Sequence, residues 1–299
     1  AWYVPVGEKN PKEKLDLFKA VFENPAIGKT GQNIKFDMAM LAKYGIKVKG
    51  ELFDTMLAHY LLAPDMRHNM DVLAENYLGY RPVSIEELIG KKGKSQLNMR
   101  DVETEKIKEY AAEDADVTLQ LRSVFEPKLS ETNAVQVFRD IEMPLIPVLV
   151  NMENEGVTID KNALQEYSIQ LGEEIASLQQ QIWIHADGSF NIQSPKQLGD
   201  ILYDKLKISD SVRKTSTKQN STAEDVLLKL AHKHPIVQLV LDYRSLTKLK
   251  STYVDVLPSL INTRTGRVHT SYNQAVAASG RLSSNYPNLL NSPIRTVRG

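Results

Sequence analysis

The sequence predicts an α/β domain over about the first 130 residues, then a mostly α-helical domain, then short strands and turns. Three observations predict this organisation. Before residue 130, segments with apolar residues at helical spacing are mixed with segments that alternate apolar and polar residues. From about Ala134 the pattern becomes helical, and after Gly266 it breaks into short extended stretches. A chain of 299 residues, 42% of them hydrophobic, is long enough for two domains with separate cores.

In the first part, strands and helices are expected to be mixed. Leu15, Phe18 and Val21 share one face of a helix, and Gly45 and Pro64 end two others. We expect a further helix with Asp101 as its N-cap, ending before Pro127. The expected strands are 2–6 and 46–53, and the expected helices are 11–22, 54–62, 71–78 and 101–125, with a strand end passing into a helix over 33–44.

The second part is expected to be helical up to about residue 260. Gly156 is a typical helix stop, and Ser194 before Pro195 is a typical helix start. We expect Thr222 to cap a short helix after a polar loop over 209–222. The other expected helices are 135–155 (bent at Pro144 and Pro147), 161–185, 194–206 and 235–260. No internal repeat is found.

Composition excludes several classes of protein. There is no cysteine, so a disulfide scaffold, a thiolate zinc site and a Cys nucleophile are excluded, and a reducing cytoplasm is expected. No apolar run approaches the roughly 18 residues of a membrane span, and no signal-peptide pattern opens the chain. The net charge is zero, but residues 1–190 hold 21 Lys and Arg against 30 Asp and Glu, whereas residues 191–299 hold 16 against 7. This asymmetry favours nucleic acid as a partner of the basic part, although a lopsided solvated surface fits the charge equally well.

Two acids and a phenol suggest phosphodiester chemistry. Asp37 is expected at the start of a helix, and Tyr110 and Asp114 lie four residues apart, on one helical face. Hydrolysis with two metal ions needs several carboxylates and a group that orients the attacking water. Taken alone, such a Tyr/Asp pair is more often structural than catalytic.

A second group of residues is basic. Arg244 and Lys248 lie on one face of the expected helix 235–260, while Leu246, Leu249 and Tyr253 form another. A rigid helix that presents cations and hydroxyls suits phosphate contacts, which need charge but no reading of bases. An ordinary amphipathic surface helix explains the pattern about equally well.

The order of several motifs separates these alternatives. GQNIKFDMAMLAKYGI, FDTMLAHYLLAP, RHNMDVLAENYLGY and EYAAEDADVTLQL resemble the proofreading domain of bacterial family A DNA polymerases. SPKQLGDILYDKLKI, YRSLTKLKSTY and TGRVHTSYNQAVAASGRLSSNYPNLLNSPIR resemble the thumb and thumb-to-palm junction of the same family. Together the motifs cover essentially the whole chain. The resemblance implies a partial ribonuclease-H-like 3′–5′ exonuclease domain over 1–130, a helical thumb over 131–265 and the beginning of an α+β palm over 266–299.

The resemblance also implies residue roles. Asp37 and Asp114 match metal ligands for Mg²⁺, Mn²⁺ or Zn²⁺, and Tyr110 matches a water-orienting catalytic residue. Gln32 and Arg67 match positions that hold a frayed single-stranded 3′ end, and Ile85 stands where relatives often carry Phe. Arg281 matches the residue that reaches the minor groove at the primer end, where all base pairs present similar acceptors. Further DNA-binding positions are matched by Asn191, Ser194, Arg244, Lys248, Lys250, Ser251, Asn288 and Asn291.

Departures from the family pattern limit the expected activity. The family's Asp-x-Glu motif, which supplies two of four metal-binding carboxylates, has no match before Asp37. We therefore expect a chain that starts inside the exonuclease domain and has no useful exonuclease activity; Mg²⁺-dependent release of 3′-terminal nucleotides would contradict this. Leu290 and Ser292 replace the Gln and Ile of the usual PNLQNIP. The palm aspartates and the dNTP-binding fingers are expected beyond Gly299, so a polymerase centre is not expected within the chain.

Two other functions fit the sequence less well. A stand-alone exonuclease similar to ribonuclease D would carry an Asp-x-Glu motif and no GRLSS segment, and neither condition is met. A natural DNA-binding module without chemistry would have little reason to retain Asp37, Tyr110 and Asp114. The sequence therefore predicts part of a monomeric, cytoplasmic DNA-directed DNA polymerase of replication and repair. Its partners would be primer–template DNA and a single-stranded 3′ end, with dNTPs as substrates of the parent enzyme.

Overall fold

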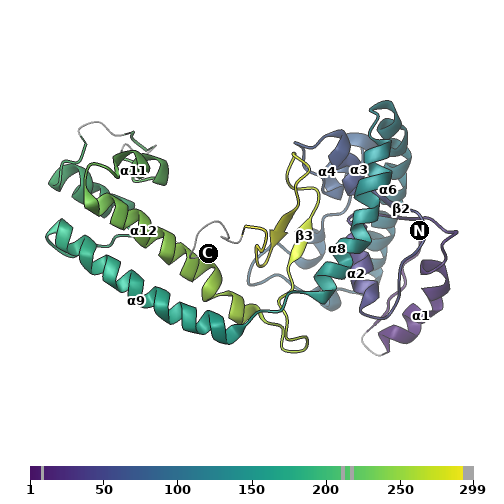
Figure 1. Ribbon diagram of the computed structural model, residues 1–299. Helices are drawn as coiled ribbons and strands as arrows, with labels where there is room; N and C mark the ends of the chain where they lie inside the picture. Colours follow the sequence, from purple (N-terminus) through teal and green to yellow (C-terminus); the bar gives the residue numbers. More distant parts are fainter. Residues whose placement is uncertain (8–9, 210–212, 216–218, 292–299) are drawn as a thin grey trace. The chain divides into compact units, whose positions relative to one another are not determined.

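The computed structural model describes residues 1–7, 10–209, 213–215 and 219–291. The chain divides into two compact units (Figure 1). The first, called here the N-terminal unit, comprises Ala1–Gly156 and Thr270–Asn288. The second, called the helical unit, comprises Val157–His269 and the described residues from Leu289 onwards. This division by contacts differs from the domain limits at residues 130 and 265 that we predicted, because the helices between residues 135 and 155 and the strands after residue 270 pack with the N-terminal unit.

The N-terminal unit is mainly helical around two small sheets. Strand β1 (Lys29–Gly31) is parallel to β2 (Leu52–Asp54), and β3 (Ser271–Asn273) is antiparallel to β4 (Ser283–Asn285). A π-helical turn over Phe138–Glu142 joins the last two helices, and a 3₁₀ turn spans Met99–Asp101. The helices are α1 (Pro11–Phe22), α2 (Ile34–Ala42), α3 (Thr55–Leu62), α4 (Met70–Leu78), α5 (Ile85–Ile89), α6 (Thr104–Glu131), α7 (Val135–Val137) and α8 (Met143–Glu155).

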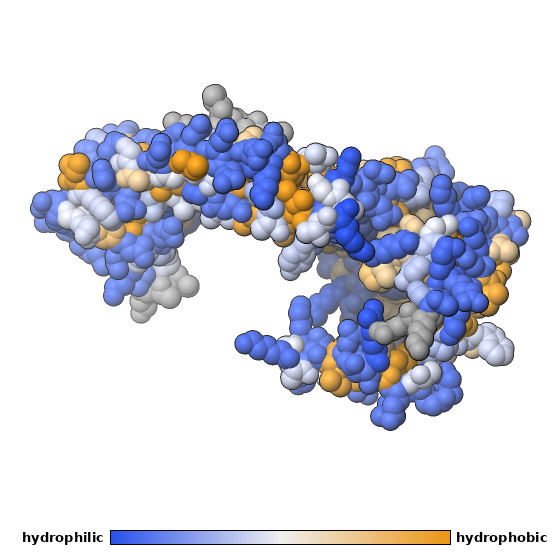
Figure 2. All heavy atoms as spheres, turned by 90° about the horizontal axis from the view of Figure 1, so that it is seen from below, coloured by the Kyte–Doolittle hydropathy of each residue, from blue (hydrophilic) through white to orange (hydrophobic). Residues whose placement is uncertain are grey.

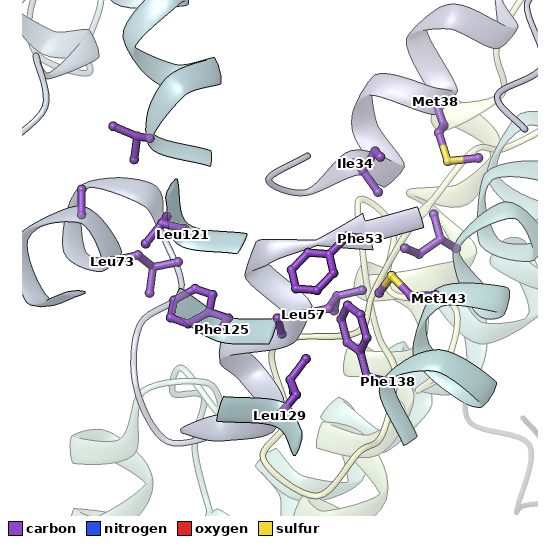
Figure 3. Packing of buried hydrophobic residues seen from close by; sticks show 14 of the residues in the cluster. Ile34, Met38, Phe53, Leu57, Leu73, Leu121, Phe125, Leu129, Phe138 and Met143 are labelled. Carbon is purple, nitrogen blue, oxygen red and sulfur yellow. The ribbon is translucent and has the colours of Figure 1, made fainter. Parts of the chain in front are cut away.

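One continuous core fills this unit. Phe53 of β2 packs against Phe138, with ring centroids 4.9 Å apart, and Leu57 and Met143 lie beside them (Figure 3). Phe125 of α6 lies near Leu73 and Leu121 in the same cluster (Figure 3). These side chains are almost fully buried, so they fix α3, α4 and α6 around the short parallel sheet.

The helical unit is built on two long antiparallel helices, α9 (Lys161–Ala186) and α12 (Pro235–Leu249), which lie side by side (Figure 1). Two shorter helices, α10 (Pro195–Gly199) and α11 (Glu224–Leu230), pack near one end. π-helical turns over Asp200–Lys205 and Lys250–Val254 extend α10 and α12, and a 3₁₀ turn covers Leu257–Leu260. Ile182, Leu202 and Val240 belong to the apolar core of this unit.

Several element predictions are confirmed. Helix α1 has the predicted limits, and Gly156 ends α8 with a positive φ of 66°. The hydroxyl of Ser194 accepts a hydrogen bond from the backbone N–H of Gln197 at the start of α10. The short strands expected after Gly266 are present as β3 and β4.

Other element predictions are wrong, each for a physical reason. Residues 2–6 form no strand, and the side chain of Trp2 is 95% exposed. Only the end of the predicted strand 46–53 forms, because Gly50 adopts a φ of 95° just before β2. Asp101 closes a 3₁₀ turn with Asn98 and does not cap α6. Helix α6 continues through Pro127, since buried Phe125 and Leu129 hold it on both sides.

On the face shown in Figure 2, hydrophilic residues predominate and hydrophobic residues form small groups. In the part of the chain that the structure describes, no helix is both long and apolar enough to cross a membrane.

Candidate nucleic-acid interface and acidic site

Asp37 lies in the first turn of α2, directly after β1. Asn33 precedes the helix with a φ of 58°, and the backbone N–H groups of Asn33 and Ile34 donate to the carboxylate of Asp54 at 3.1 and 2.8 Å. The Asp37 carboxylate borders a surface hollow of about 370 Å³. Partial desolvation by the surrounding protein, and then the charge of Asp54, raise the pKa of Asp37 to about 6.

Tyr110 and Asp114 lie one turn apart on α6, where the phenol is close enough to the carboxylate to affect its pKa. Desolvation raises the pKa of Asp114 to about 6, hydrogen bonding from Tyr110 lowers it, and the charges of Glu113 and Asp71 add to the rise. Desolvation and Asp114 raise the pKa of Tyr110 to about 12. The phenol is therefore a hydrogen-bond donor at neutral pH.

The described residues do not form the two-metal site that the family resemblance implies. Among them, no three His, Cys, Asp or Glu side chains are grouped so that they could hold a metal ion. Asp54 is the charged neighbour of Asp37, whereas Glu113 and Asp71 are those of Asp114. Two carboxylates are too few for two divalent ions.

The side chain of Gln32 forms hydrogen bonds within the N-terminal unit. Its amide nitrogen donates to the carbonyl of His68 at 2.7 Å, and its amide oxygen accepts from the hydroxyl of Thr55. It thereby ties the start of α3 to the segment that carries exposed Arg67. Ile85 begins α5 with 42% of its side chain exposed.

Two acids with a clear structural role were not predicted as site residues. Asp54 is 1% exposed and caps α3, accepting from the backbone N–H groups of Met56 and Leu57. The Glu113 carboxylate accepts from the Tyr80 hydroxyl and the Val83 backbone N–H, fixing the loop before α5 next to Asp114. An acid placed directly between β2 and α3 is the signal that could have identified Asp54.

A pair of histidines, fully buried His59 and half-buried His68, lies beside Arg67. The Nδ1 atoms of His59 and His68 are 2.7 Å apart, so one ring must donate and the other accept. His59 also bonds the Tyr77 hydroxyl through Nε2 at 3.1 Å. Desolvation, and then the charge of His68, lower the pKa of His59 to about 4, and desolvation lowers the pKa of His68. The pair is therefore held neutral.

This pair predicts a pH effect on stability. His59 binds fewer protons in the folded state between its folded pKa of about 4 and its ordinary value of 6.5. The contribution of neutral His59 to the free energy of unfolding is therefore fully present above pH 6.5, and it is lost as the pH falls to about 4. As the pH falls through this range, we expect the free energy of unfolding of the wild-type chain to decrease by on the order of 3 kcal/mol relative to that of His59→Gln. Urea unfolding at several pH values measures this difference.

Asp37, Asp54 and Asp114 change the free energy of unfolding in the opposite direction with pH. Because their pKa values are raised, they favour the folded state below about pH 4, and this contribution is lost as the pH rises through 6. The wild type and the His59 variant share these aspartates, so their effects cancel in the difference between the two proteins. Exposed His232 of the helical unit provides the matched control, since His232→Gln makes the same substitution at the surface of the other unit. A difference in the free energy of unfolding between wild type and His59→Gln that stays constant at all pH values would contradict the prediction.

The helical unit presents a hollow of about 700 Å³ whose lining includes several residues with polar or charged side chains. Arg244, Lys248 and Ser251 line it from α12 and the following π-helical turn. Gln193 and Pro195, which flank Ser194, line it from the loop before α10. The structure thus brings together two predicted DNA-binding regions that are about fifty residues apart in the sequence.

The loop before α10 is a tight turn. The backbone N–H of Asn191 donates to the Gln197 side chain at 2.7 Å, and the Asn191 side-chain oxygen accepts from the Gln193 backbone N–H at 3.0 Å. The Ser194 backbone N–H donates to the Asn191 carbonyl at 3.0 Å. Asn191 and Ser194 are therefore held in fixed positions next to the hollow.

The three cations of α12 and its extension have different surroundings. Lys248 is exposed. The Arg244 guanidinium donates to the carbonyl of Thr222 and to its hydroxyl, the latter at 3.3 Å, and burial lowers the pKa of Arg244. The prediction that Thr222 caps α11 is wrong, because Ala223 occupies the N-cap position and Thr222 is engaged by Arg244 instead. The Lys250 ammonium donates to Ser168 at 2.6 Å and to both carboxylate oxygens of Asp255 at 2.9 and 3.0 Å, so its three N–H groups are engaged.

Arg281 is exposed and follows Gly280, whose φ is 75°. Asn288 accepts from the Ser284 hydroxyl at 3.1 Å, and the Asn291 carbonyl accepts from the Tyr253 hydroxyl at 2.8 Å. Leu290, one of the two departures from the family pattern, is 50% exposed. Ser292, the other, lies outside the described residues.

Comparisons with known proteins agree with the two parts of the chain. The family model "3'-5' exonuclease" matches residues 2–130, and the model "DNA polymerase family A" matches residues 161–299. The chain is 46% identical to DNA polymerase I of Pseudomonas aeruginosa over 100% of its own length and 34% of the relative. It is 36% identical to DNA polymerase I of Bacillus subtilis, covering 100% of the chain and 33% of the relative.

A solved structure is also similar. It is described as the POL domain of Pol1 from M. smegmatis in complex with DNA primer-template and dNTP. The TM-score is 0.82 at 29% identity, over 96% of this chain and 46% of that chain. The chain spans about a third of the length of the two curated relatives above. From these matches, which together cover both units, the chain belongs to the bacterial family A DNA polymerases, of the DNA polymerase I type.

Proposed function

We propose that the helical unit binds the sugar–phosphate backbone of primer–template DNA, and that Arg281 of the N-terminal unit contacts the primer end. The observation that carries this proposal is the hollow lined in part by Arg244, Lys248 and Ser251, beside the loop of Asn191 and Ser194. The similar M. smegmatis structure, which contains primer–template DNA, supports it.

The residues that line the hollow, and Lys250 next to Ser251, have distinct parts in this proposal. Exposed Lys248 supplies a mobile positive charge for a phosphate, and Ser251 supplies a hydroxyl donor. Arg244, fixed by Thr222, contributes positive potential to the lining of the hollow. Lys250, engaged with Ser168 and Asp255, holds α9 against the extension of α12. Because none of these groups reads bases, binding should have no sequence preference.

Arg281 is proposed to test the geometry of the primer-terminal base pair. In the minor groove every base pair presents acceptors at similar positions, so one guanidinium can bind correctly shaped pairs of any sequence. Asn288 and Asn291 would add polar contacts to the adjoining duplex.

For the N-terminal unit we propose a part in 3′–5′ exonuclease chemistry. Asp37 and Asp114 would serve as carboxylate ligands of a divalent metal ion, and the Tyr110 phenol, which is a donor at neutral pH, would orient water. Gln32 and Arg67 would hold the single-stranded 3′ end. Family A polymerases and their exonuclease domains use divalent metals. Since the described acids of this chain do not complete such a site, we expect it to bind DNA without hydrolysing it.

We further propose the assignment of these units within the whole enzyme. The N-terminal unit up to residue 130 would belong to a ribonuclease-H-like exonuclease domain, residues 131–265 to the thumb and residues 266–299 to the palm. The whole protein would be a DNA-directed DNA polymerase that extends a primer with dNTPs, which is consistent with the name of its relatives.

The proposal predicts weak, salt-dependent binding of this chain to primer–template duplex. If about four phosphates are neutralised, affinity should fall by about 100-fold between 50 and 200 mM salt, because bound counterions are released from DNA. Fluorescence anisotropy with a labelled duplex measures this, and a second duplex of unrelated sequence should give the same affinity. Affinity independent of salt would rule out a phosphate-based interface.

A further inference from the structure

The strands that lead to and from Arg281 are fastened to the rest of the N-terminal unit by buried polar side chains. The segment involved is Thr270–Asn288, which contains β3, β4 and the turn at Gly280. Along it, the exposed Ser271 alternates with the buried side chains of Tyr272 and Gln274. The buried side chains face helices that come from much earlier in the sequence.

The first attachment is a clamp on Tyr272. The Lys35 ammonium donates to the Tyr272 carbonyl at 2.6 Å, and the backbone N–H of Tyr272 donates to the Glu153 carboxylate at 2.7 Å. Lys35 and Glu153 also form an ion pair, with only 11% and 14% of their side chains exposed. Charged hydrogen bonds that are shielded from water in this way are stronger and more strictly oriented than neutral ones.

Two more attachments follow along the segment. The Gln274 side-chain amide donates to the Glu142 carboxylate at 2.6 Å and to the Glu142 carbonyl at 3.1 Å. The hydroxyl of Tyr60, on α3, donates to the Ala277 carbonyl at 2.6 Å and accepts from the Gly280 backbone N–H at 3.0 Å. Tyr60 is 3% exposed. Gly280, held by this hydroxyl in a left-handed conformation, is the residue immediately before Arg281.

We propose that Tyr60, Lys35 and Glu153 are positioning residues for Arg281, an inference that rests on the proposed contact of Arg281 with the primer end. The Tyr60 hydroxyl bridges both sides of the 277–280 turn, so it sets where the Arg281 backbone begins. The Lys35–Glu153 clamp fixes β3, the strand that enters this turn. None of the three side chains is expected to touch DNA.

The same contacts link Arg281 to the candidate exonuclease residues. Lys35 lies two residues before Asp37 on α2, and Tyr60 lies on α3, which Asp54 caps. Asp54 in turn binds the backbone at the start of α2. A shift of α2 or α3 would therefore disturb the contacts that hold β3 and the turn before Arg281.

The test is a double-mutant cycle between Tyr60→Phe and Arg281→Ala, read as the affinity of the chain for primer–template DNA with a recessed 3′ end. A continuous duplex of the same length reports binding away from a primer end. The change to Phe keeps the ring and removes only the hydroxyl. Tyr77→Phe is the matched control, since its hydroxyl bonds His59 in the same unit and is not among the attachments of the 270–288 segment. Thermal unfolding of each variant checks the fold.

We expect Arg281→Ala to lower affinity for the recessed end by about tenfold or more, since a hydrogen-bonded charge is lost. Tyr60→Phe should lower it about threefold or more and add nothing further in the Arg281→Ala background. Tyr77→Phe should leave it unchanged, and the continuous duplex should respond to none of the variants. If Tyr60→Phe destabilises the chain, Glu153→Gln gives the same cycle, because Gln still accepts from Tyr272 but loses the ion pair with Lys35.

The outcomes separate the two claims. If Arg281→Ala weakens binding but Tyr60→Phe and Glu153→Gln behave as Tyr77→Phe does, the positioning role is overturned and the Arg281 contact stands. Independent, additive losses for Tyr60→Phe and Arg281→Ala also overturn the positioning role. If Arg281→Ala has no effect at the recessed end, the proposed Arg281 contact is overturned, and the positioning role with it.

Discussion

Replacing Asp54 by alanine is expected to lower the free energy of unfolding of the N-terminal unit by about 3 kcal/mol. The Asp54 carboxylate accepts four backbone hydrogen bonds, from Asn33, Ile34, Met56 and Leu57. The bonds to Ile34 and Leu57 are buried, so the alanine variant leaves donors that water cannot reach. The loss should therefore exceed the roughly 1 kcal/mol of an ordinary N-cap.

Asp160 provides the matched control. It caps α9 with two backbone hydrogen bonds at 3.0 Å, but it is exposed, so Asp160→Ala should cost about 1 kcal/mol. Asp54→Asn should cost less than Asp54→Ala, because the amide oxygen still accepts and no charge is desolvated. Hydrogen exchange of the amides of α2 and α3 measures the effect locally, which is necessary because two units need not unfold together. Equal losses in Asp54→Ala and Asp160→Ala would contradict the role given to Asp54.

The second large effect is expected at Lys248. Lys248→Glu should lower the affinity for primer–template duplex by an order of magnitude or more at low salt, because a phosphate contact becomes a repulsion. The neutral variant Lys248→Ala should reduce the slope of log affinity against log salt by about 1. Binding titrations at several salt concentrations measure both quantities.

Lys233→Glu is the control for net charge. Lys233 is exposed in the turn between α11 and α12 and does not line the hollow, yet its replacement changes the total charge by the same amount. We expect it to weaken binding far less than Lys248→Glu does. Equal effects of the two variants would mean that only the overall charge matters and that the hollow is not the binding surface.

Local signals allowed much of the fold to be predicted. The Ser194-Pro195 start of α10 and the stop of α8 at Gly156 depend on residues whose backbone preferences act within one turn. The strand predicted for residues 2–6 is wrong. A strand-like sequence indicates only that a segment can pair with another strand, and the described structure gives residues 2–6 no such partner. Helix α6 passes Pro127 because the burial of Phe125 and Leu129 outweighs the lost hydrogen bond, and that packing is set by distant parts of the chain.

In the candidate sites too, local features could be predicted from the sequence, whereas contacts between distant residues could not. Tyr110 and Asp114 are paired by helix periodicity, which a sequence shows directly. That Arg244 would bind Thr222, or that Lys250 would be engaged by Ser168 and Asp255, depends on contacts that no local pattern encodes. The Lys35–Glu153 clamp on Tyr272 joins residues more than a hundred positions apart, so only the folded chain brings it together.

The central claim is that the chain holds a double helix by its phosphates while Arg281 reaches the groove at the primer end. Hydroxyl-radical footprinting of a primer–template duplex tests it most directly, with wild-type chain and with Arg281→Ala at concentrations that saturate the DNA. The account predicts protection along the duplex backbone for both proteins and a loss of protection only around the primer terminus for the variant. Identical footprints for the two proteins, or no protection of the duplex at all, would contradict it.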